Sequence, residues 1–301
     1  MTRFEEFDRD LLPGFERHWV STPDGMILTL VAGEGPPVLM LHGDPQTHLC
    51  WHHQAGHLAD RHRVVLADLR GRGESHKPRA GTGLESYAKR TMAAEMREVM
   101  RSLGHDRFAV VGHDRGARVA RRLALDHPEA VERLVVMDIV PALDFYDGMN
   151  AEIAQDYFYF SFLTQDHPVP ESLIAGDPVG FMRLILTGLS DKPVDYDARA
   201  LETYLAAASE PSSVAAMCEC FRAGYHLDRL HDAADRASGN RIRCPSLVMW
   251  GESGVVGRHF DMREIWSRWC ETVAFQPMPT GHFIPEEAPN DVLAILEDFL
   301  R

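Results

Sequence analysis

Residues 108–118 read FAVVGHDRGAR, and this stretch decides how the chain is expected to fold. Four apolar residues, 108–111, are typical of a short buried strand. Glycines at 112 and 116 then enclose a tight turn, and residues 117–126, ARVARRLALD, are expected to form a helix. The sequence therefore predicts a strand, a sharp turn and a helix, with Asp114 at the centre of the turn.

The spacing Gly-x-Asp-x-Gly places Asp114 where a nucleophile elbow holds its nucleophile, although most elbows carry Ser there. The flanking glycines permit strained backbone angles and a close approach of strand and helix, which pushes the central side chain into the site. A carboxylate in that position can attack carbon directly and form a covalent ester. The alternative is a glycine-rich turn in which Asp114 is an ordinary helix cap.

Length and charge limit the classes of function. The chain has 301 residues, of which 45% are apolar, enough for one large domain with an insertion. Its net charge of −14 argues against nucleic acid and anionic membranes as partners. No apolar run is long enough for a bilayer, and the first ten residues lack the apolar region of a signal peptide. We therefore expect a cytoplasmic protein whose five scattered cysteines are reduced.

Short apolar stretches alternate with helical patterns through most of the chain, which is typical of a mainly parallel sheet covered on both faces by helices. Helices are expected at 87–103 and 292–300, and a hairpin at 19–31. Further strands are expected at 37–41, 63–67, 134–139, 246–250 and 273–278. The region 142–240 shows helical patterns broken by prolines. We therefore predict an α/β core domain, 1–141 and 241–301, with an inserted helical cap domain, 142–240.

This organisation resembles the α/β-hydrolase fold with a cap. Four motifs carry the resemblance: HGDP at 42–45, DLRGRGES at 68–75, GHDRG at 112–116 and GHF at 281–283. Within the branch that uses an aspartate nucleophile, the chain is most similar to the haloacetate and fluoroacetate dehalogenases, through HGDPQTH, GHDRGARVARRLALDHPE, VVMDIVP and GHFIPEEAP. The resemblance implies hydrolysis of the carbon–halogen bond of a short haloacid, without cofactor or metal, by a homodimer.

Three residues are candidates for the catalytic groups. Asp114 would expel halide and form an ester, and His282, in the loop after the last strand, would activate water against that ester. A buried acid must hold the histidine in one tautomer. Asp138, at the end of the strand after the elbow, is favoured for that role as in haloacetate dehalogenases, while Glu252 and Asp261 are weaker candidates.

Backbone N–H groups of Asp44 and Arg115 are expected to form the oxyanion hole. Asp44 stands where the family commonly has Phe. Arg115 and Arg118 follow Asp114 by one and four residues, so both project from the first turn of one helix and could bind a substrate carboxylate through bidentate hydrogen bonds. The alternative is a solvated helix face, which is the expectation for Arg121 and Arg122.

The cap departs from the family at the halide pocket. Tyr159 and Phe160 stand in place of a His-Trp pair, Phe221 in place of Tyr, and Thr187 where a further Trp is found. Of three halide donors, only Tyr159 retains a polar proton. Because fluoride needs strong hydrogen bonds as it leaves, we expect chloroacetate and bromoacetate to be turned over faster than fluoroacetate.

Two other functions remain open. An epoxide hydrolase would use the same three catalytic residues, with Tyr159 and either Tyr204 or Tyr225 as proton donors. A non-catalytic binder of small carboxylates is the rival outside the enzymes. Four clustered histidines are interpreted as a solvated helix start and not as a metal site: His48, His52, His53 and His57.

Overall fold

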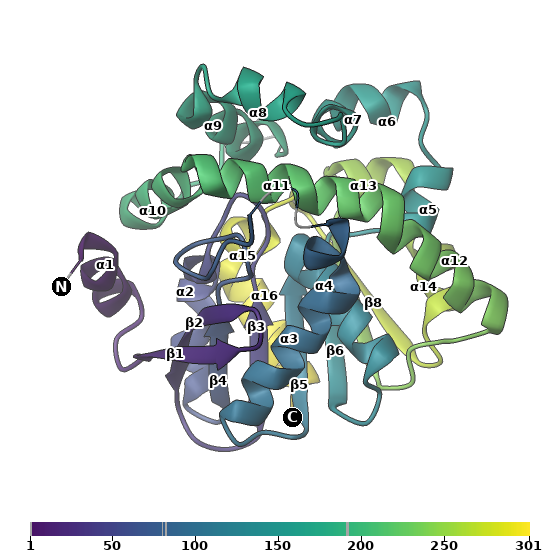
Figure 1. The fold of residues 1–301 in the computed structure, drawn as a ribbon. Helices are drawn as coiled ribbons and strands as arrows, with labels where there is room; N and C mark the ends of the chain where they lie inside the picture. Colours follow the sequence, from purple (N-terminus) through teal and green to yellow (C-terminus); the bar gives the residue numbers. More distant parts are fainter. Residues whose placement is uncertain (1, 80, 82, 191–192) are drawn as a thin grey trace.

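Eight strands form a single sheet in this computed structural model, which describes residues 2–79, 81, 83–190 and 193–301 (Figure 1). The strand order is β1-β2-β4-β3-β5-β6-β7-β8. β2 is antiparallel to β1 and β4, and all the other neighbours are parallel. This confirms the predicted mainly parallel sheet. The bounds are β1 Glu16–Thr22, β2 Gly25–Ala32, β3 Pro37–Leu41, β4 Arg63–Ala67, β5 Phe108–His113, β6 Val131–Met137, β7 Ser246–Gly251 and β8 Val273–Met278.

The central strands are buried on both sides, as expected for apolar runs in a parallel sheet. Every residue of β5 and β7 is buried, and β3, β4 and β8 have the predicted bounds. β6 differs, because it begins at Val131 and ends at Met137 instead of spanning 134–139. The positive φ of 54° at Asp138 turns the chain out of the strand direction at that point.

Helices cover both faces of the sheet (Figure 1). α3 and α4 pack together on one face, and α2 and α16 pack together on the other. The predicted helix 87–103 begins later, at Lys89, because the residues before it form a separate 3-10 helix, η2. No helix in the described part of the chain is long and apolar enough to cross a membrane. The bounds are α1 Arg3–Leu11, η1 His48–Trp51, α2 His52–Ala59, η2 Leu84–Tyr87, α3 Lys89–Ser102, α4 Arg115–Asp126, α13 Val255–His259, α14 Met262–Trp269, α15 Ile284–Glu287 and α16 Pro289–Phe299.

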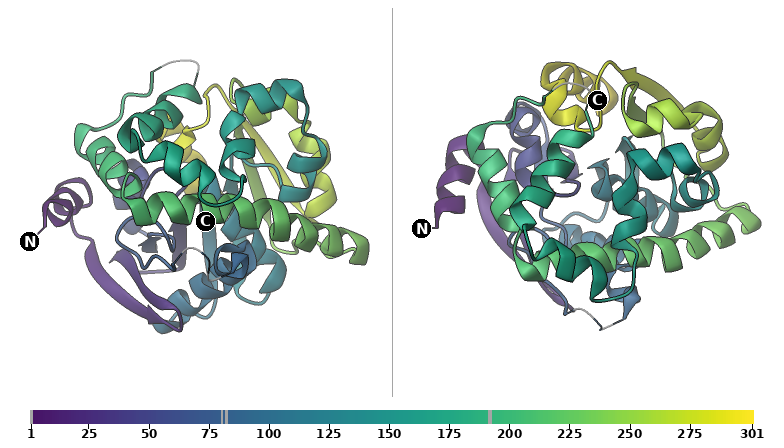
Figure 2. Two further views of the ribbon diagram at one scale, coloured as in Figure 1. Left: turned by 45° about the horizontal axis from the view of Figure 1, so that its top comes forward. Right: turned by 90° about the horizontal axis from the view of Figure 1, so that it is seen from above.

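The cap segment, residues 142–240, contains helices joined by loops, and its described residues include no strand. α11 crosses above the ends of the strands, with α6, α7, α8 and α9 beyond it (Figures 1 and 2). α12 continues from α11 through a π-helical turn and packs against α5 (Figure 1). The cap segment therefore covers the edge of the sheet at which β5 and β6 end. Its helices are α5 Ala142–Asp147, α6 Ala151–Asp156, α7 Phe158–Leu163, α8 Val169–Ile174, α9 Pro178–Gly188, α10 Ala198–Ala208, α11 Pro211–Ala223, η3 Gly224–Asp228 and α12 Arg229–Ser238.

Candidate active site

Asp114 occupies a strained turn between β5 and α4. Its backbone angles, φ 44° and ψ −114°, lie in a region that residues with side chains rarely adopt. The turn is tight because Gly116 packs against β3, where an added Cβ would lie 2.2 Å from the carbonyl oxygen of Leu41. The Asp114 carboxylate accepts no hydrogen bond from the first turn of α4, all of which is described. The turn therefore has the geometry predicted for an elbow, and Asp114 is not an ordinary cap.

The two carboxylate oxygens of Asp114 have different surroundings. Oδ2 accepts a hydrogen bond from the backbone N–H of Asp44 at 3.0 Å, and Oδ1 lies 4.0 Å from Nε2 of His282. Gly43 permits this approach, because a Cβ there would lie 2.5 Å from the Asp114 Cβ. Burial opposes ionisation, but the charges of Arg115 and His282 outweigh it and hold the pKa of Asp114 well below its usual range. Asp114 is therefore an ionised buried carboxylate with one oxygen held by an amide.

His282 is held by Asp138. The imidazole Nδ1–H donates to Asp138 Oδ2 at 2.6 Å, and the backbone N–H of Gly251 donates to the other carboxylate oxygen at 3.0 Å. This arrangement directs Nε2 of His282 toward Asp114. Burial lowers the pKa of His282, but the hydrogen bond and charge of Asp138 outweigh it, so the net shift is upward.

The two weaker candidates for the acid lie elsewhere. Asp261 caps α14, where its Oδ1 accepts the N–H of Glu264 at 2.9 Å. Glu252 is exposed just beyond the end of β7. The structure thus brings together Asp114, His282 and Asp138, as the motif order predicts.

The backbone amide and the side-chain carboxylate of Asp44 bind different partners. While its N–H binds Asp114, its carboxylate is gripped by the guanidinium of Arg72 through two hydrogen bonds, one of them 2.6 Å from Nη2 to Oδ2. Arg115 Nε lies 3.9 Å from the same Oδ2. Both members of the Asp44–Arg72 pair are buried. An acid at this place is therefore compatible with an anionic site, because its charge is turned away and paired.

His113 is a neighbour that the sequence reasoning missed. Its Nε2–H donates to the carbonyl oxygen of His282 at 2.7 Å, which ties the histidine loop to the end of β5. Burial, with a contribution from the charge of His282, lowers the pKa of His113 to about 3, so this imidazole is neutral. Its position directly before Asp114 in the sequence could have identified His113 as a neighbour of the site.

Arg115 and Arg118 are buried, contrary to the solvated alternative. The guanidinium carbon of Arg115 lies 3.5 Å from the ring centroid of Phe221, a stacked arrangement that leaves Nε and Nη2 without a hydrogen-bond partner. Nε of Arg118 also lacks a partner. Both line one cavity with Tyr146 and Phe160. Burial, and then the like charge of the neighbouring Arg115, lower the pKa of Arg118.

The expectation that Arg121 and Arg122 are solvated was wrong. Both are buried under α12 of the cap segment, where they share the carboxylate of Asp232 at 2.7 Å and 2.9 Å. Arg122 also donates to Asp235 at 2.6 Å. Arg122 has one partner within α4, Asp126 at 2.9 Å, but Asp232 and Asp235 are more than a hundred residues away in the sequence, so the pattern of α4 alone could not reveal the burial under α12.

The predicted cap residues meet at the site. Phe160 and Phe221 pack edge to face with ring centroids 5.0 Å apart, and Tyr159 contacts Phe221 at 5.9 Å. All three are buried, and the negative charge of Asp114 adds to burial in raising the pKa of Tyr159. Thr187, by contrast, lies on an exposed face of α9 and donates to its own helix.

Tyr157 is a second phenol that was not anticipated. It is buried, its ring centroid lies 5.4 Å from that of Tyr159, and the charges of Asp138 and Asp114 add to burial in raising its pKa. The helical conformation is interrupted at Tyr157, which lies between α6 and α7. This interruption turns the Tyr157 side chain inward, next to that of Tyr159. The other proposed donors point elsewhere: Tyr204 donates to Glu286 at 2.6 Å, and Tyr225 is 37% exposed.

The four histidines are not a uniform solvated group. His48 is buried and lies 2.9 Å from a carboxylate oxygen of both Asp68 and Asp8. Burial lowers its pKa, but the two carboxylates outweigh this and raise it to about 10, so His48 is a structural cation. His53 and His57 are exposed, as expected, and His52 is half-buried.

Comparison with known proteins gives one family model, and the relatives include a dehalogenase and epoxide hydrolases. The model of the α/β hydrolase fold matches residues 36–289. The chain is 38% identical to a fluoroacetate dehalogenase from Burkholderia sp, over 96% of this chain and 95% of that protein. It is 31% identical to a soluble epoxide hydrolase from Corynebacterium sp. (strain C12), over 94% and 93%. A solved structure of a proposed α/β hydrolase from Nostoc sp PCC 7120 is 42% identical, with a TM-score of 0.92 and coverage of 95% of this chain and 98% of that chain.

Proposed function

Because the chain belongs to the α/β-hydrolase family, we propose that it hydrolyses the carbon–halogen bond of short 2-haloacids such as chloroacetate and bromoacetate. One observation carries the proposal: Arg115 and Arg118 are buried beside Asp114 with guanidinium N–H groups that no described protein group accepts. A substrate carboxylate would supply the missing acceptors and relieve the repulsion between the two cations.

In the first step, Oδ1 of Asp114 attacks the halogen-bearing carbon. A carbon–oxygen bond forms as the carbon–halogen bond breaks, and halide leaves with the bonding electron pair. The depressed pKa of Asp114 keeps the attacking carboxylate ionised. Arg115 and Arg118 would offset the repulsion between this carboxylate and the substrate anion.

In the second step, Nε2 of His282 takes a proton from water, which adds to the Asp114 carboxyl carbon. Negative charge then develops on Oδ2, the oxygen that already accepts the Asp44 N–H. The backbone N–H of Arg115 is the second proposed hydrogen-bond donor to this oxyanion. The intermediate expels the alkoxide oxygen of the product, which takes the proton from His282 and gives a hydroxyacid. Asp114 is left as a carboxylic acid, and its depressed pKa means that it releases this last proton to solvent and returns to the carboxylate. Asp138 stabilises the imidazolium that exists between these transfers.

We propose that the cap segment forms the halide side of the site. Tyr159 and Tyr157 would donate hydrogen bonds to the departing halide, while Phe160 and Phe221 exclude water from it. Two phenols are fewer and weaker donors than the histidine, tryptophan and tyrosine of the family pattern. Fluoroacetate is therefore expected to react more slowly than chloroacetate.

The decisive test is a trapped ester. The variant His282→Asn, incubated with chloroacetate, should release about one equivalent of chloride and retain a carboxymethyl group on the peptide containing Asp114, detected by mass spectrometry. The exposed His57 provides a matched control, because His57→Asn should turn over normally. Absence of both the adduct and wild-type chloride release would refute the proposal.

A second candidate is an epoxide hydrolase, favoured by the unexpected pair Tyr157 and Tyr159. Two phenols facing a carboxylate nucleophile could protonate an epoxide oxygen as the ring opens. Turnover of styrene oxide without release of halide from any haloacetate would decide for this activity. Binding of chloroacetate with neither turnover nor adduct would instead indicate a non-catalytic carboxylate binder.

A further inference from the structure

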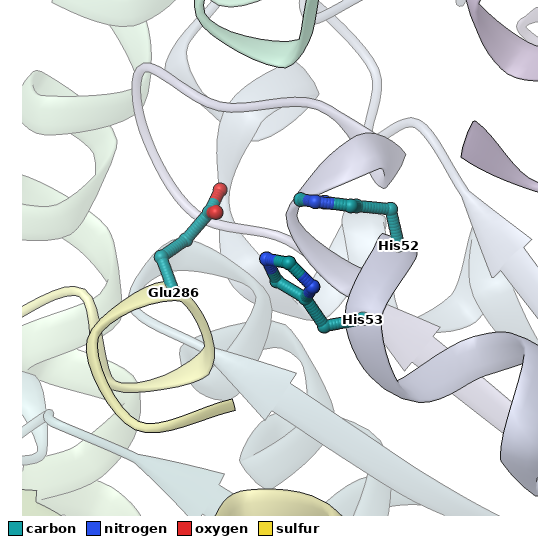
Figure 3. Close-up of side chains that lie close together, drawn as sticks. All are labelled: His52, His53 and Glu286. Carbon is teal, nitrogen blue, oxygen red and sulfur yellow. The ribbon is translucent and has the colours of Figure 1, made fainter. Parts of the chain in front are cut away.

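A second cluster of ionisable side chains lies outside the proposed site. His52 and His53 begin α2, and Glu286 belongs to α15; one ligand atom of each lies within 4.8 Å of the others. The carboxylate of Glu286 points toward the two imidazoles (Figure 3). The proposed reaction uses none of these three residues.

Two atoms of this cluster are buried without a hydrogen-bond partner, namely Nε2 of His52 and Oε2 of Glu286. Glu286 is 6% exposed, and its other oxygen already accepts hydrogen bonds from Tyr204 at 2.6 Å and from Gln46 at 3.1 Å. Unpartnered buried acceptors are uncommon in proteins and indicate that something else satisfies them. With Glu286 ionised, both of these atoms carry lone pairs, and a donor or a cation would satisfy them.

The tautomer of His52 selects between these possibilities. Its Nδ1 lies 2.7 Å from the carbonyl oxygen of Leu49, and since a carbonyl only accepts, the proton must be on Nδ1. Nε2 is then an unprotonated nitrogen turned toward the cluster. A histidine whose Nδ1–H is held by a carbonyl while Nε2 is bare is prepared to bind a metal.

The charges nearby also favour a cation. The carboxylate of Asp197 lies close enough to act electrostatically on His52, His53 and Glu286. The guanidinium of Arg199 is itself engaged by Asp197, at 2.8 Å.

We propose that His52 Nε2, a ring nitrogen of His53 and Glu286 Oε2 bind one divalent transition-metal ion of the Zn²⁺ class, with water completing the coordination. Two imidazoles and one carboxylate suit Zn²⁺ and exclude a preference for Mg²⁺ or Ca²⁺, which favour oxygen ligands. Ligands around Zn²⁺ lie about 3.4 Å apart, so the cluster must contract on binding. The exposed side chain of His53, whose ring centroid lies 3.8 Å from that of His52, would have to turn inward for this.

The bound ion would brace two loops that carry the proposed site. Glu286 follows His282 by four residues, and Gln46, which donates to Glu286, follows Asp44 by two. A metal joining α2 to α15 would therefore fix the loop of His282 against the loop of Asp44. The expected consequence is a more stable protein, because an ion that binds only the folded state shifts the equilibrium toward it.

The test uses the full chain without an affinity tag, freed of metal by a chelator. Titration with Zn²⁺ in a calorimeter should show one site per chain, and Co²⁺ should give the visible absorption of a four-coordinate site. His53→Ala removes an exposed ligand without disturbing the core, and should weaken Zn²⁺ binding at least tenfold and abolish the Co²⁺ bands. Glu286→Gln should do the same.

The matched control is His57→Ala, which removes an exposed histidine from the same helix and should leave binding unchanged. Mg²⁺ should give no heat above dilution. Equal Zn²⁺ affinity in wild type and His53→Ala would overturn the proposal, as would the absence of a stoichiometric site in the wild-type protein. Neither result depends on the enzymatic activity, so the proposed function stands or falls separately.

Discussion

The backbone N–H of Asp44 donates to Asp114 Oδ2 at 3.0 Å while the carboxylate of the same residue is bound by Arg72. One residue thus links the oxygen that would become the oxyanion to a buried ion pair. Since the amide is part of the main chain, its position depends on how firmly the Asp44 side chain is held.

Removing the Asp44 carboxylate should therefore destabilise the protein. Asp44→Ala leaves the Arg72 cation buried and unpaired, a change that costs about 3–5 kcal/mol of unfolding free energy. Urea denaturation followed by circular dichroism measures this. The double variant Asp44→Ala/Arg72→Met should recover part of the loss, because no lone charge remains buried. A single variant as stable as wild type would contradict the structural role of the pair.

The second step should fail at acid pH before the first. His282 acts as a base only when neutral, and its pKa is raised by Asp138 above the ordinary value of about 6.5. As pH falls through that raised pKa, kcat should decline while Asp114, whose pKa is depressed, still forms the ester. Quenched-flow mass spectrometry should then show ester accumulating on the enzyme.

Stability has the opposite dependence for the same group. Because the pKa of His282 is raised in the folded state, the His282–Asp138 interaction contributes fully to the free energy of unfolding below the unfolded-state pKa, and this contribution is lost as pH rises through the folded-state pKa.

Asp138→Asn should lower the pKa of His282 and move the acid limb of kcat to lower pH. An acid limb that stays in place would show that another group controls it.

Arg118 should control the affinity for the substrate anion. Losing one charge-assisted hydrogen bond of about 1.5–3 kcal/mol should raise KM for chloroacetate roughly 10- to 100-fold in Arg118→Gln. The neutral analogue chloroacetamide separates charge recognition from general damage, because its reaction should be little affected by the variant. Arg97→Gln, on the exposed side of α3, is the control. Equal effects on both substrates would exclude carboxylate binding by Arg118.

Removing the hydroxyl groups of Tyr157 and Tyr159 should slow the release of a poor leaving group, fluoride, more than that of a good one, bromide. Tyr159→Phe and Tyr157→Phe remove one hydrogen-bond donor each, which should slow fluoroacetate by about ten-fold or more and bromoacetate much less. Ion chromatography of released fluoride and bromide gives both rates. Tyr225→Phe, an exposed cap tyrosine, should change neither. Uniform slowing of both halides would indicate that the phenols act in packing.

The sequence was most informative where structure is local. A strand, two glycines and a helix define the elbow within eleven residues. Asp138 could be favoured because it stands at the end of the strand after the elbow, as in haloacetate dehalogenases, and because the turn after Trp250 has no aspartate. The burial of charged side chains could not be predicted from the sequence where it depends on partners far away in the chain. His48 is enclosed by Asp8 and Asp68, and Arg121 by Asp232, residues brought together only by the fold.

The cap segment shows the same limit on a smaller scale. Tyr157 and Tyr159 are two residues apart, so a continuous helix would point them in different directions. The break at Tyr157 between α6 and α7 places both phenols on one side. A short irregular turn of this kind has no firm sequence pattern, and the second phenol was therefore missed.

Eleven of the twelve residues of α4 are buried, since the helix packs against β5, β6 and α3, and α12 binds its Arg121 and Arg122. A helix so enclosed tolerates few replacements, and most changes within it would cost folding before they could alter selectivity. New substrate preferences in this scaffold would therefore arise by exchanging side chains of α7 and α11. Libraries built to change the acid that is accepted should randomise those helices and leave the elbow untouched.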